Sequence, residues 1–373
     1  MNEKKWPNHF YVLDFSRGIA ALSVVLWHWQ HFAYIGIAES FNFEKKSQPL
    51  YGVFCIFYEA GAMGVQYFFI VSGFIFFWLY ANQVNNRAIT GWKFSVHRFS
   101  RLYPLHFVTL VIVAILQIIY VSREHSAFIY QYNDVYHFFL NLFYATRWGF
   151  ESGHSFNASI WSVSVEIVLY FTFFLTLLFR KGGCFFCLFI SFLSLIIARL
   201  TDNVILGGMS LFFLGGTVYY LTKFIVLQDY KLKVSIYIAT ISCWCMVIID
   251  FYIIDFSSNI LSLGIFGKIL LRGFSFYILF PLTICSLILA EIDNGALFKP
   301  MAWVGDISYS SYLIHFPLQL IFALGVSYGI LSKAFYLRTE YLLLFFLILI
   351  PLSYFTFIKF EKPIQKFLRN KLL

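Results

Sequence analysis

The chain has 373 residues, of which 60% are hydrophobic and only 12% are charged. Soluble domains carry about 45–50% apolar and about 25% charged residues, so this composition excludes an ordinary soluble globular protein. The formal net charge is +9. The Lys and Arg residues lie between apolar runs rather than on one basic face, so no nucleic-acid partner is expected.

Apolar runs of about 18 or more residues recur along the chain, and each can cross a hydrocarbon core of about 30 Å. Continuous runs of this kind favour helices over barrel strands, because backbone groups in lipid must be satisfied internally. We expect one all-α integral membrane domain over residues 1–373, with no appended soluble domain. In chain order the expected spans are about 11–33, 62–80, 102–121, 159–179, 184–199, 205–224, 233–251, 273–291, 304–326 and 340–360. The stretch 252–272 is a candidate re-entrant or interfacial segment.

The distribution of positive charge predicts the orientation of these ten or so helices. Of the 27 Lys and Arg residues, 17 fall on the side of the N-terminus and nine on the other, with Arg17 inside a span. Cytoplasmic loops carry an excess of such residues, so both termini are expected in the cytoplasm. Lys4 and Lys5 mimic a secretory signal, but Asp14 and Arg17 interrupt the apolar run behind them, which favours a retained first span.

Two of the expected outward connections are long, at about 34–61 and 122–158. The second is rich in aromatic residues interleaved with polar ones, among them Tyr130, Tyr132, Tyr136, Trp148 and Phe150. Such a segment is typical of an aromatic belt on an interfacial helix. The alternative is an acceptor-binding surface on which sugar rings stack.

The six Cys residues lie within or beside apolar segments. Cys184 and Cys187 form a Cys-x-x-Cys pair, but its surroundings are apolar and no His or acidic residue is near. Apolar packing is therefore the favoured interpretation, and neither a metal site nor redox chemistry is predicted.

The first span carries three ionisable residues, which cost at least about 2.5–3.5 kcal/mol each on insertion scales and so indicate function. It reads LDFSRGIAALSVVLWHW and contains Asp14, Arg17 and His28. Eleven α-helical residues return to within about 20° of the starting direction, so Arg17 and His28 are expected on one face, about 16 Å apart along the axis. Asp14 lies one turn from Arg17 and is expected to pair with it.

An imidazole inside a membrane span, such as that of His28, suits a reaction in which a hydroxyl attacks a thioester. It would remove the proton of that hydroxyl, or carry the acyl group itself. The alternative is that Asp14 and Arg17 form only a helix ion pair and that His28 is a satisfied interior histidine. His31, one turn further on, is a weaker candidate for the same role.

Two other spans place polar groups on one helix face. In SIWSVSVEIVLYF, Glu166 shares a face with Ser162, and it either orients an imidazole or the acceptor, or fixes helix packing. In GDISYSSYLIHFP, Tyr312 and His315 share a face. His315 is a second buried imidazole, ranked below His28 because its own helix carries no acid–arginine pair.

Arg98 and Arg101 precede the third span in HRFSRLYPLH and lie one turn apart. This arrangement suits a bidentate grip on phosphates, or else snorkelling toward lipid headgroups. Ser72 and Gly73 form a small-residue pair in the otherwise bulky YFFIVSGFIF. Close helix packing is the favoured interpretation of that pair.

Six segments, taken in this order, resemble the acyltransferase 3 family of integral membrane acyltransferases: LDFSRGIAALSVVLWH, FFIVSGF, RFSRLYP, SIWSVSVEIVLY, GDISYSSYLIHFP and FIKFEKP. The resemblance covers about residues 10–365. The family includes bacterial enzymes that O-acylate surface carbohydrates, among them lipopolysaccharide and exopolysaccharide. It therefore implies a multi-pass enzyme of the bacterial inner membrane. Such an enzyme would move an acyl group, usually acetyl, from cytoplasmic acyl-CoA to a hydroxyl of a carbohydrate or glycolipid acceptor.

The resemblance also implies roles for individual residues. Arg17 and His28 correspond to the essential Arg and His of the first span, and Arg98 and Arg101 to contacts with the donor's phosphates. Three sets are predicted on this basis: Asp14, Arg17, His28 and Glu166 as catalytic; Arg98, Arg101 and Ser72 as donor-binding; Trp161, Ser162, Tyr312 and His315 as acceptor-binding. Some members carry an extracytoplasmic hydrolase-like domain, so this chain is expected to act through its membrane domain alone or with a separate extracytoplasmic partner.

The alternative function is a proton-coupled transporter of a glycolipid or small solute, in which the intramembrane His, Asp, Glu and Arg form a relay. Transporters often show repeat symmetry between their halves, and the sequence shows none. The Arg98–Arg101 pair also suits a phosphorylated donor better than a proton path.

Overall fold

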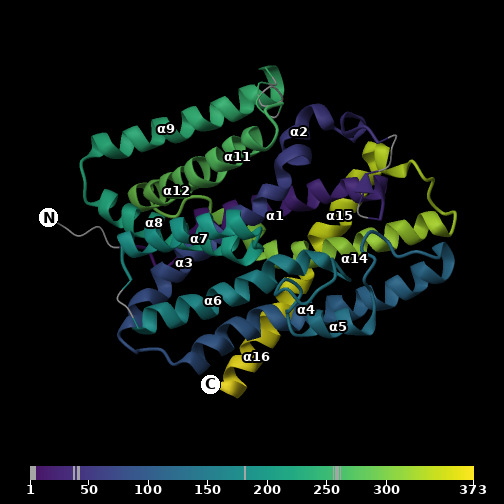
Figure 1. Ribbon diagram of the computed structural model, residues 1–373, viewed down its shortest axis with the longest axis horizontal. Helices are drawn as coiled ribbons and strands as arrows, with labels where there is room; N and C mark the ends of the chain where they lie inside the picture. Colours follow the sequence, from purple (N-terminus) through teal and green to yellow (C-terminus); the bar gives the residue numbers. More distant parts are fainter. Residues whose placement is uncertain are drawn as a thin grey trace. The chain divides into compact units, whose positions relative to one another are not determined.

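The computed structural model describes residues 6–36, 38, 39, 43–179, 182–254, 256, 260 and 262–373. In this part of the chain the secondary structure is helical, apart from an antiparallel pair formed by β1 (Tyr34–Ile35) and β2 (Ala38–Glu39) (Figure 1). Nine of the described helices are long and apolar enough to cross a membrane. The predicted all-α integral membrane fold is therefore confirmed. Lys4, Lys5, Arg180 and Lys181, which entered the charge count, lie outside the described residues.

The chain forms two compact units. The first comprises Met1–Ala20, Met63–Ala88 and Phe171–Gly305, and the second comprises Ala21–Ala62, Ile89–Tyr170 and Asp306–Leu373. Two of the long helices, α1 (Tyr11–Trp27) and α6 (Trp161–Phe179), contribute residues to both units, and the division also passes through the short helices η3 (Gly61–Met63) and α13 (Trp303–Asp306).

The first unit is built from α3 (Gly64–Asn85), α7 (Cys184–Thr201), α8 (Val204–Val226), α9 (Tyr230–Ile249), α11 (Ile265–Phe274) and α12 (Phe280–Asn294). Shorter pieces are the π-helices η5 (Asp250–Ile254) and η6 (Ser275–Leu279), the 3₁₀ helix η7 (Lys299–Met301) and α13 (Trp303–Asp306). The green helices α9 and α12 lie side by side (Figure 1). Part of the candidate interfacial stretch 252–272 lies outside the described residues, and from Ile265 onward the chain is helical and continues into the eighth predicted span.

Glycines bring α3 and α8 into close contact. A Cβ atom on Gly73 would lie 1.8 Å from the backbone oxygen of Phe212, and one on Gly215 would lie 2.0 Å from that of Ile70. Small residues at such crossings allow the dispersion contacts that associate helices in lipid. The packing role predicted for the Ser72–Gly73 pair is therefore supported at Gly73.

The second unit is built from α2 (Tyr51–Ala60), α4 (Gly91–Glu124), α5 (Val135–Leu142), α14 (Ser308–Ser327), α15 (Thr339–Thr356) and α16 (Lys362–Leu372). Shorter pieces are η1 (His28–Ala33), η2 (Lys45–Ser47), η3 (Gly61–Met63), η4 (Ala158–Ile160), η8 (Phe335–Leu337) and the π-helix η9 (Phe357–Glu361). The most buried candidate span is α14, which packs against α4, α15 and η4. An apolar cluster that includes Trp29, Leu318 and Phe345 joins η1 to α14 and α15.

One predicted boundary and one predicted helix type are wrong, and both concern candidate site residues. The third span begins at Gly91, where the Thr90 side chain accepts a hydrogen bond from the Lys93 backbone N–H, so Arg98 lies inside a helix rather than ahead of one. The first span is α-helical only to Trp27 and continues from His28 as a 3₁₀ helix. Because a 3₁₀ helix has about 3.0 residues per turn, the α-helical periodicity that predicted the direction of His28 ends before that residue.

The contact between α3 and α8 can be tested by substitution at Gly73. We expect Gly73→Ala to destabilise the protein by roughly 1–3 kcal/mol, because the new methyl group meets backbone rather than a movable side chain. Gly207→Ala in α8 is the matched control, since a Cβ there meets nothing within 4 Å. Thermal unfolding of both variants in one detergent measures the difference; equal midpoints would contradict the close approach.

Candidate functional site

The predicted ion pair of the first span is present in the first unit. The Arg17 guanidinium lies 3.7 Å from Asp14 Oδ1, and the other Asp14 oxygen accepts a hydrogen bond from His9. A Cβ on Gly305 would lie 2.1 Å from the Asp14 backbone oxygen, so α13 packs directly on this turn of α1. Asp14 and Arg17 are therefore held in a tightly packed part of their unit.

A carboxylate that the sequence analysis did not identify fixes the start of α1. Glu291 of α12 accepts hydrogen bonds from the backbone N–H groups of Tyr11 (3.1 Å) and Val12 (2.9 Å). The first N–H groups of a helix have no partner within that helix, and an acidic group there also complements the helix dipole. Glu291 thus has a structural reason to be buried.

The second unit brings three imidazoles together, and we call His28, His31 and His315 the histidine stack. The rings of His28 and His315 lie 4.8 Å apart between centroids and only 11° from parallel. The ring of His31 lies 4.6 Å from that of His28 at an angle of 39°. His28 therefore has one imidazole face-to-face with it and a second one tilted against it.

Hydrogen bonds from α14 hold the histidine stack in place. The Gln319 amide donates to the His28 backbone oxygen (2.7 Å), and its own oxygen accepts from His31 Nδ1 (3.3 Å). The Nδ1 of His315 donates to the backbone oxygen of Tyr312 (2.7 Å). A neutral imidazole with a proton on Nδ1 has a free lone pair on Nε2, so this bond fixes the tautomer of neutral His315.

The start of α6 meets the histidine stack through polar contacts. Ser159 Oγ lies 3.4 Å from His315 Nε2, and the Tyr312 hydroxyl donates to the Ser159 backbone oxygen (2.8 Å). Ser162 Oγ lies 2.9 Å from the Tyr312 hydroxyl. The Glu166 carboxylate interacts electrostatically with the Tyr312 phenol. Four of the predicted residues, Ser162, Glu166, Tyr312 and His315, thus belong to one polar network.

The two arginines of α4 are half-buried and make contacts within the protein. The Arg98 guanidinium lies 5.8 Å from the centroid of the Tyr170 ring. Arg101 interacts electrostatically with Glu361, whose carboxylate accepts a hydrogen bond from Ser310 Oγ (2.5 Å). Glu361 ends the π-helix η9. Short π-helical segments are frequent at functional sites.

The helix α16 adds positive charge beside these arginines. Arg369 donates to Ser100 Oγ (3.2 Å) and to the His97 backbone oxygen (3.3 Å), which fixes α16 against α4. Lys362, Lys366 and Lys371 are exposed on the same helix. The second unit therefore presents a basic region built from α4 and α16.

The predicted site residues divide between the two units. The first unit holds Asp14, Arg17 and Ser72, and the second holds His28, Arg98, Arg101, Trp161, Ser162, Glu166, Tyr312 and His315. Sequence reasoning missed Ser159 and Gln319, which contact the histidine stack. Gln319 had a usable signal, because a buried amide one turn after His315 in an apolar helix requires hydrogen-bond partners.

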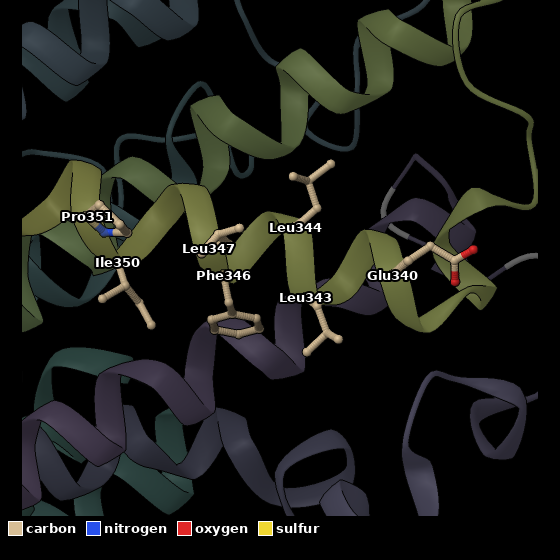
Figure 2. Close-up of a pocket in the computed structure, with 7 residues that line it drawn as sticks. All are labelled: Glu340, Leu343, Leu344, Phe346, Leu347, Ile350 and Pro351. Atoms are coloured by element: carbon tan, nitrogen blue, oxygen red, sulfur yellow. The ribbon is translucent and has the colours of Figure 1, made fainter.

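An apolar groove along α15 is separate from these groups. Figure 2 shows Leu343, Phe346, Leu347 and Ile350 along it, with Glu340 at one end. It contains none of the predicted site residues, so it does not enter the chemistry. Among the described residues, no group of three or more His, Cys, Asp or Glu side chains is arranged to hold a metal ion.

Comparisons with known proteins identify the family of the chain. A family model described as an acyltransferase domain matches residues 10–358, nearly the whole chain. "Protein 2 in picA locus" of Rhizobium radiobacter is 31% identical over 108 residues, which cover 29% of this chain and 46% of that protein. The chain thus matches less than half of that relative's length. No solved structure matches significantly. Because the family model covers nearly the whole chain, the chain belongs to the acyltransferase 3 family.

Proposed function

We propose that this acyltransferase moves an acetyl group from cytoplasmic acetyl-CoA to a hydroxyl of a cell-surface carbohydrate or glycolipid, in the inner membrane of a bacterium. The observation that carries the proposal is the environment of His28. Its Nδ1 is buried and has no hydrogen-bond partner among the described residues, although its ring contacts the rings of His31 and His315. A buried polar atom of this kind calls for a ligand or water.

In the proposed reaction, His28 removes the proton from the acceptor hydroxyl as its oxygen attacks the thioester carbonyl carbon. The carbon–sulfur bond then breaks, and the CoA thiolate leaves and takes up a proton. General base catalysis of this kind contributes typically about 10²–10⁴-fold. The second route is an acetyl group carried on the His28 ring, followed by its transfer to the acceptor.

His315 serves His28 as a positioning residue in this scheme. The N–H bonds and lone pairs of an imidazole lie in the ring plane, so two rings stacked face-to-face do not pass a proton directly between them. A neutral aromatic face does stabilise a cation above it, here the imidazolium that His28 becomes. The hydrogen bond from His315 Nδ1 to the Tyr312 backbone oxygen holds the His315 ring in place and, in its neutral form, leaves Nε2 without a proton.

The donor is proposed to bind through the basic region of α4 and α16. Arg98 and Arg101 supply forked donors that match phosphate geometry. Both termini are proposed to be cytoplasmic, as the Lys and Arg distribution predicts, which places this region on the side where acetyl-CoA is found. The roles of Asp14 and Arg17 in orienting the base, and of Ser72 in donor binding, stay predictions from the sequence.

The acceptor is proposed to meet the polar network that contains Ser162, Glu166 and Tyr312, and the neighbouring Trp161. These groups lie at the start of α6 and on α14, next to His315. A separate extracytoplasmic partner that presents the acceptor is compatible with this scheme.

Substitution of His28, the proposed general base, tests the proposed reaction most directly. We expect His28→Ala to lower acetyl transfer from acetyl-CoA by about 10²–10⁴-fold, since the acceptor hydroxyl then loses its proton acceptor. Turnover is measured as CoA release by the purified protein in the presence of acceptor. His125→Asn, at an exposed histidine with a left-handed backbone (φ 57°), is the matched control and should retain full activity. Undiminished turnover in His28→Ala would remove His28 from the mechanism.

If Arg98 binds a phosphate of acetyl-CoA, its loss should weaken binding of this donor and leave turnover at saturating donor concentration unchanged. We expect Arg98→Ala to raise the apparent KM for acetyl-CoA by roughly 10-fold or more, because a charge-assisted hydrogen bond is lost. Arg123→Ala, at the other end of α4, should leave that KM unchanged. Acetyl-3′-dephospho-CoA identifies the phosphate concerned, since the effect of Arg98→Ala disappears with this donor if Arg98 binds the 3′-phosphate. An unchanged KM with both donors would dismiss the role.

The positioning role of His315 is tested by restoring only its aromatic face. Loss of the ring in His315→Ala is expected to lower kcat by roughly 10²-fold, the effect of misplacing a catalytic group by about 1 Å. His315→Phe should recover most of kcat, because the stacking partner returns without the ring nitrogens. His106, also buried and stacked on Tyr144, is the control pair, and its Ala and Phe variants should change stability without changing kcat. If the Phe variant is as inactive as the Ala variant, the ring nitrogens of His315 carry the role.

A further inference from the structure

The connection between α5 and η4 holds a second group of polar side chains, which we call the Arg147 cluster: Thr146, Arg147, Glu151 and His154. One guanidinium nitrogen of Arg147 lies 3.7 Å from Glu151 Oε1, and the two side chains are 28% and 12% exposed. His154 is half-buried and interacts electrostatically with both of them. These groups lie outside the membrane-spanning helices and outside the histidine stack.

Two buried polar atoms of the Arg147 cluster make no hydrogen bond to the described residues. Arg147 Nε and Thr146 Oγ1 are buried and have no hydrogen-bond partner among the described residues. A guanidinium offers five N–H donors, and the described contacts of Arg147 are a single long ion pair and the neighbouring His154. Buried polar atoms in folded proteins are nearly always satisfied, so these atoms indicate a ligand or ordered water.

The backbone around the cluster is held firmly enough to position a ligand. The Trp148 indole N–H donates to the Ser164 backbone oxygen of α6 (3.1 Å), and the Gly149 N–H donates to Glu151 Oε2 (3.0 Å). The Tyr136 hydroxyl donates to the Phe150 backbone oxygen (2.9 Å), which ties the segment to α5. Trp148, the next residue after Arg147, remains 38% exposed.

The charges of the cluster cancel. Burial lowers the pKa of His154 to about 4, and the nearby Arg147 acts in the same direction, so this imidazole is neutral near pH 7. Arg147 and Glu151 carry opposite charges. An anionic headgroup would be repelled by Glu151 as strongly as it is drawn to Arg147, so the cluster suits a neutral ligand rich in hydroxyl groups.

The cluster is connected to the histidine stack through one ring. Tyr130 lies 5.8 Å from His154 and 5.9 Å from His31 between ring centroids. Tyr130 also belongs to an apolar cluster with Phe316 and Leu320 of α14, the helix that carries His315. A ligand at Arg147 would therefore be a neighbour of the reacting centre rather than part of it.

We propose that the Arg147 cluster is a subsite for a neutral sugar unit of the acceptor, in which Arg147 donates to one hydroxyl and Glu151 accepts from the adjacent one. This inference rests on the proposed function, since it assigns a binding site to the same acceptor. The subsite binds the sugar unit next to the one that is acetylated. Trp148 supplies a face against which the apolar side of the ring stacks.

Binding is tested apart from catalysis with the full-length protein carrying His28→Ala, which removes turnover. The probes are methyl α-D-glucopyranoside, methyl α-D-mannopyranoside, methyl β-D-galactopyranoside and methyl α-L-rhamnopyranoside, observed by saturation-transfer NMR in nanodiscs of neutral lipid. We expect at least one of them to bind. Arg147→Gln and Glu151→Gln should each weaken that binding by roughly 10-fold or more. Arg123→Gln and Glu124→Gln, a pair of similar charge at the end of α4, should not change it.

The outcomes separate this proposal from the proposed function. Glycoside binding that depends on Arg147 and Glu151 supports the subsite even if the protein with His28 intact transfers no acetyl group, a result that would overturn only the proposed function. Binding of none of the four glycosides, or binding that both variants retain, overturns the subsite. Arg147-dependent binding to vesicles containing phosphatidylglycerol, with no glycoside binding, also overturns it in favour of a lipid headgroup.

Discussion

The face-to-face contact between His28 and His315 joins the two parts of the candidate centre. His28 comes from η1 near the start of the chain, and His315 comes from α14 near its end. Parallel rings 4.8 Å apart cannot exchange a proton in their planes, so the contact fixes the plane of the His28 ring rather than providing a proton path. The buried and unpartnered Nδ1 of His28 becomes meaningful only because the ring around it cannot turn freely.

The helix α14 is what makes that contact possible. It carries Tyr312, His315 and Gln319 at three- and four-residue spacing, so one face of a single helix holds a carbonyl partner, a stacking ring and a bridging amide. Its first turn is fixed from another side by the hydrogen bond from Ser310 to Glu361. Since Glu361 also interacts with Arg101, the same helix is held by the segment that borders the proposed donor region.

Sequence reasoning could predict what depends on local spacing. The apolar runs gave the spans, and the three-residue separation of Asp14 and Arg17 gave their ion pair. It could not predict the stacking of His28 on His315, because 287 residues separate them and no helical period relates two different helices. The direction of His28 was also beyond it, since the change from α-helix to 3₁₀ helix at that residue follows from tertiary packing of Trp29 and its neighbours rather than from propensity.

The electrostatics of two regions of the second unit argue for different ligands at each. Around α4 and α16, cations exceed anions: Arg98, Arg101, Arg369 and the exposed lysines of α16 outnumber the carboxylates of Glu361 and Asp306. At the Arg147 cluster one guanidinium faces one carboxylate and a neutral imidazole. An excess of positive charge favours a polyanion such as CoA, whereas a balanced pair favours hydroxyl groups. A donor with several phosphates would be attracted to the first region, and a neutral sugar would gain little there.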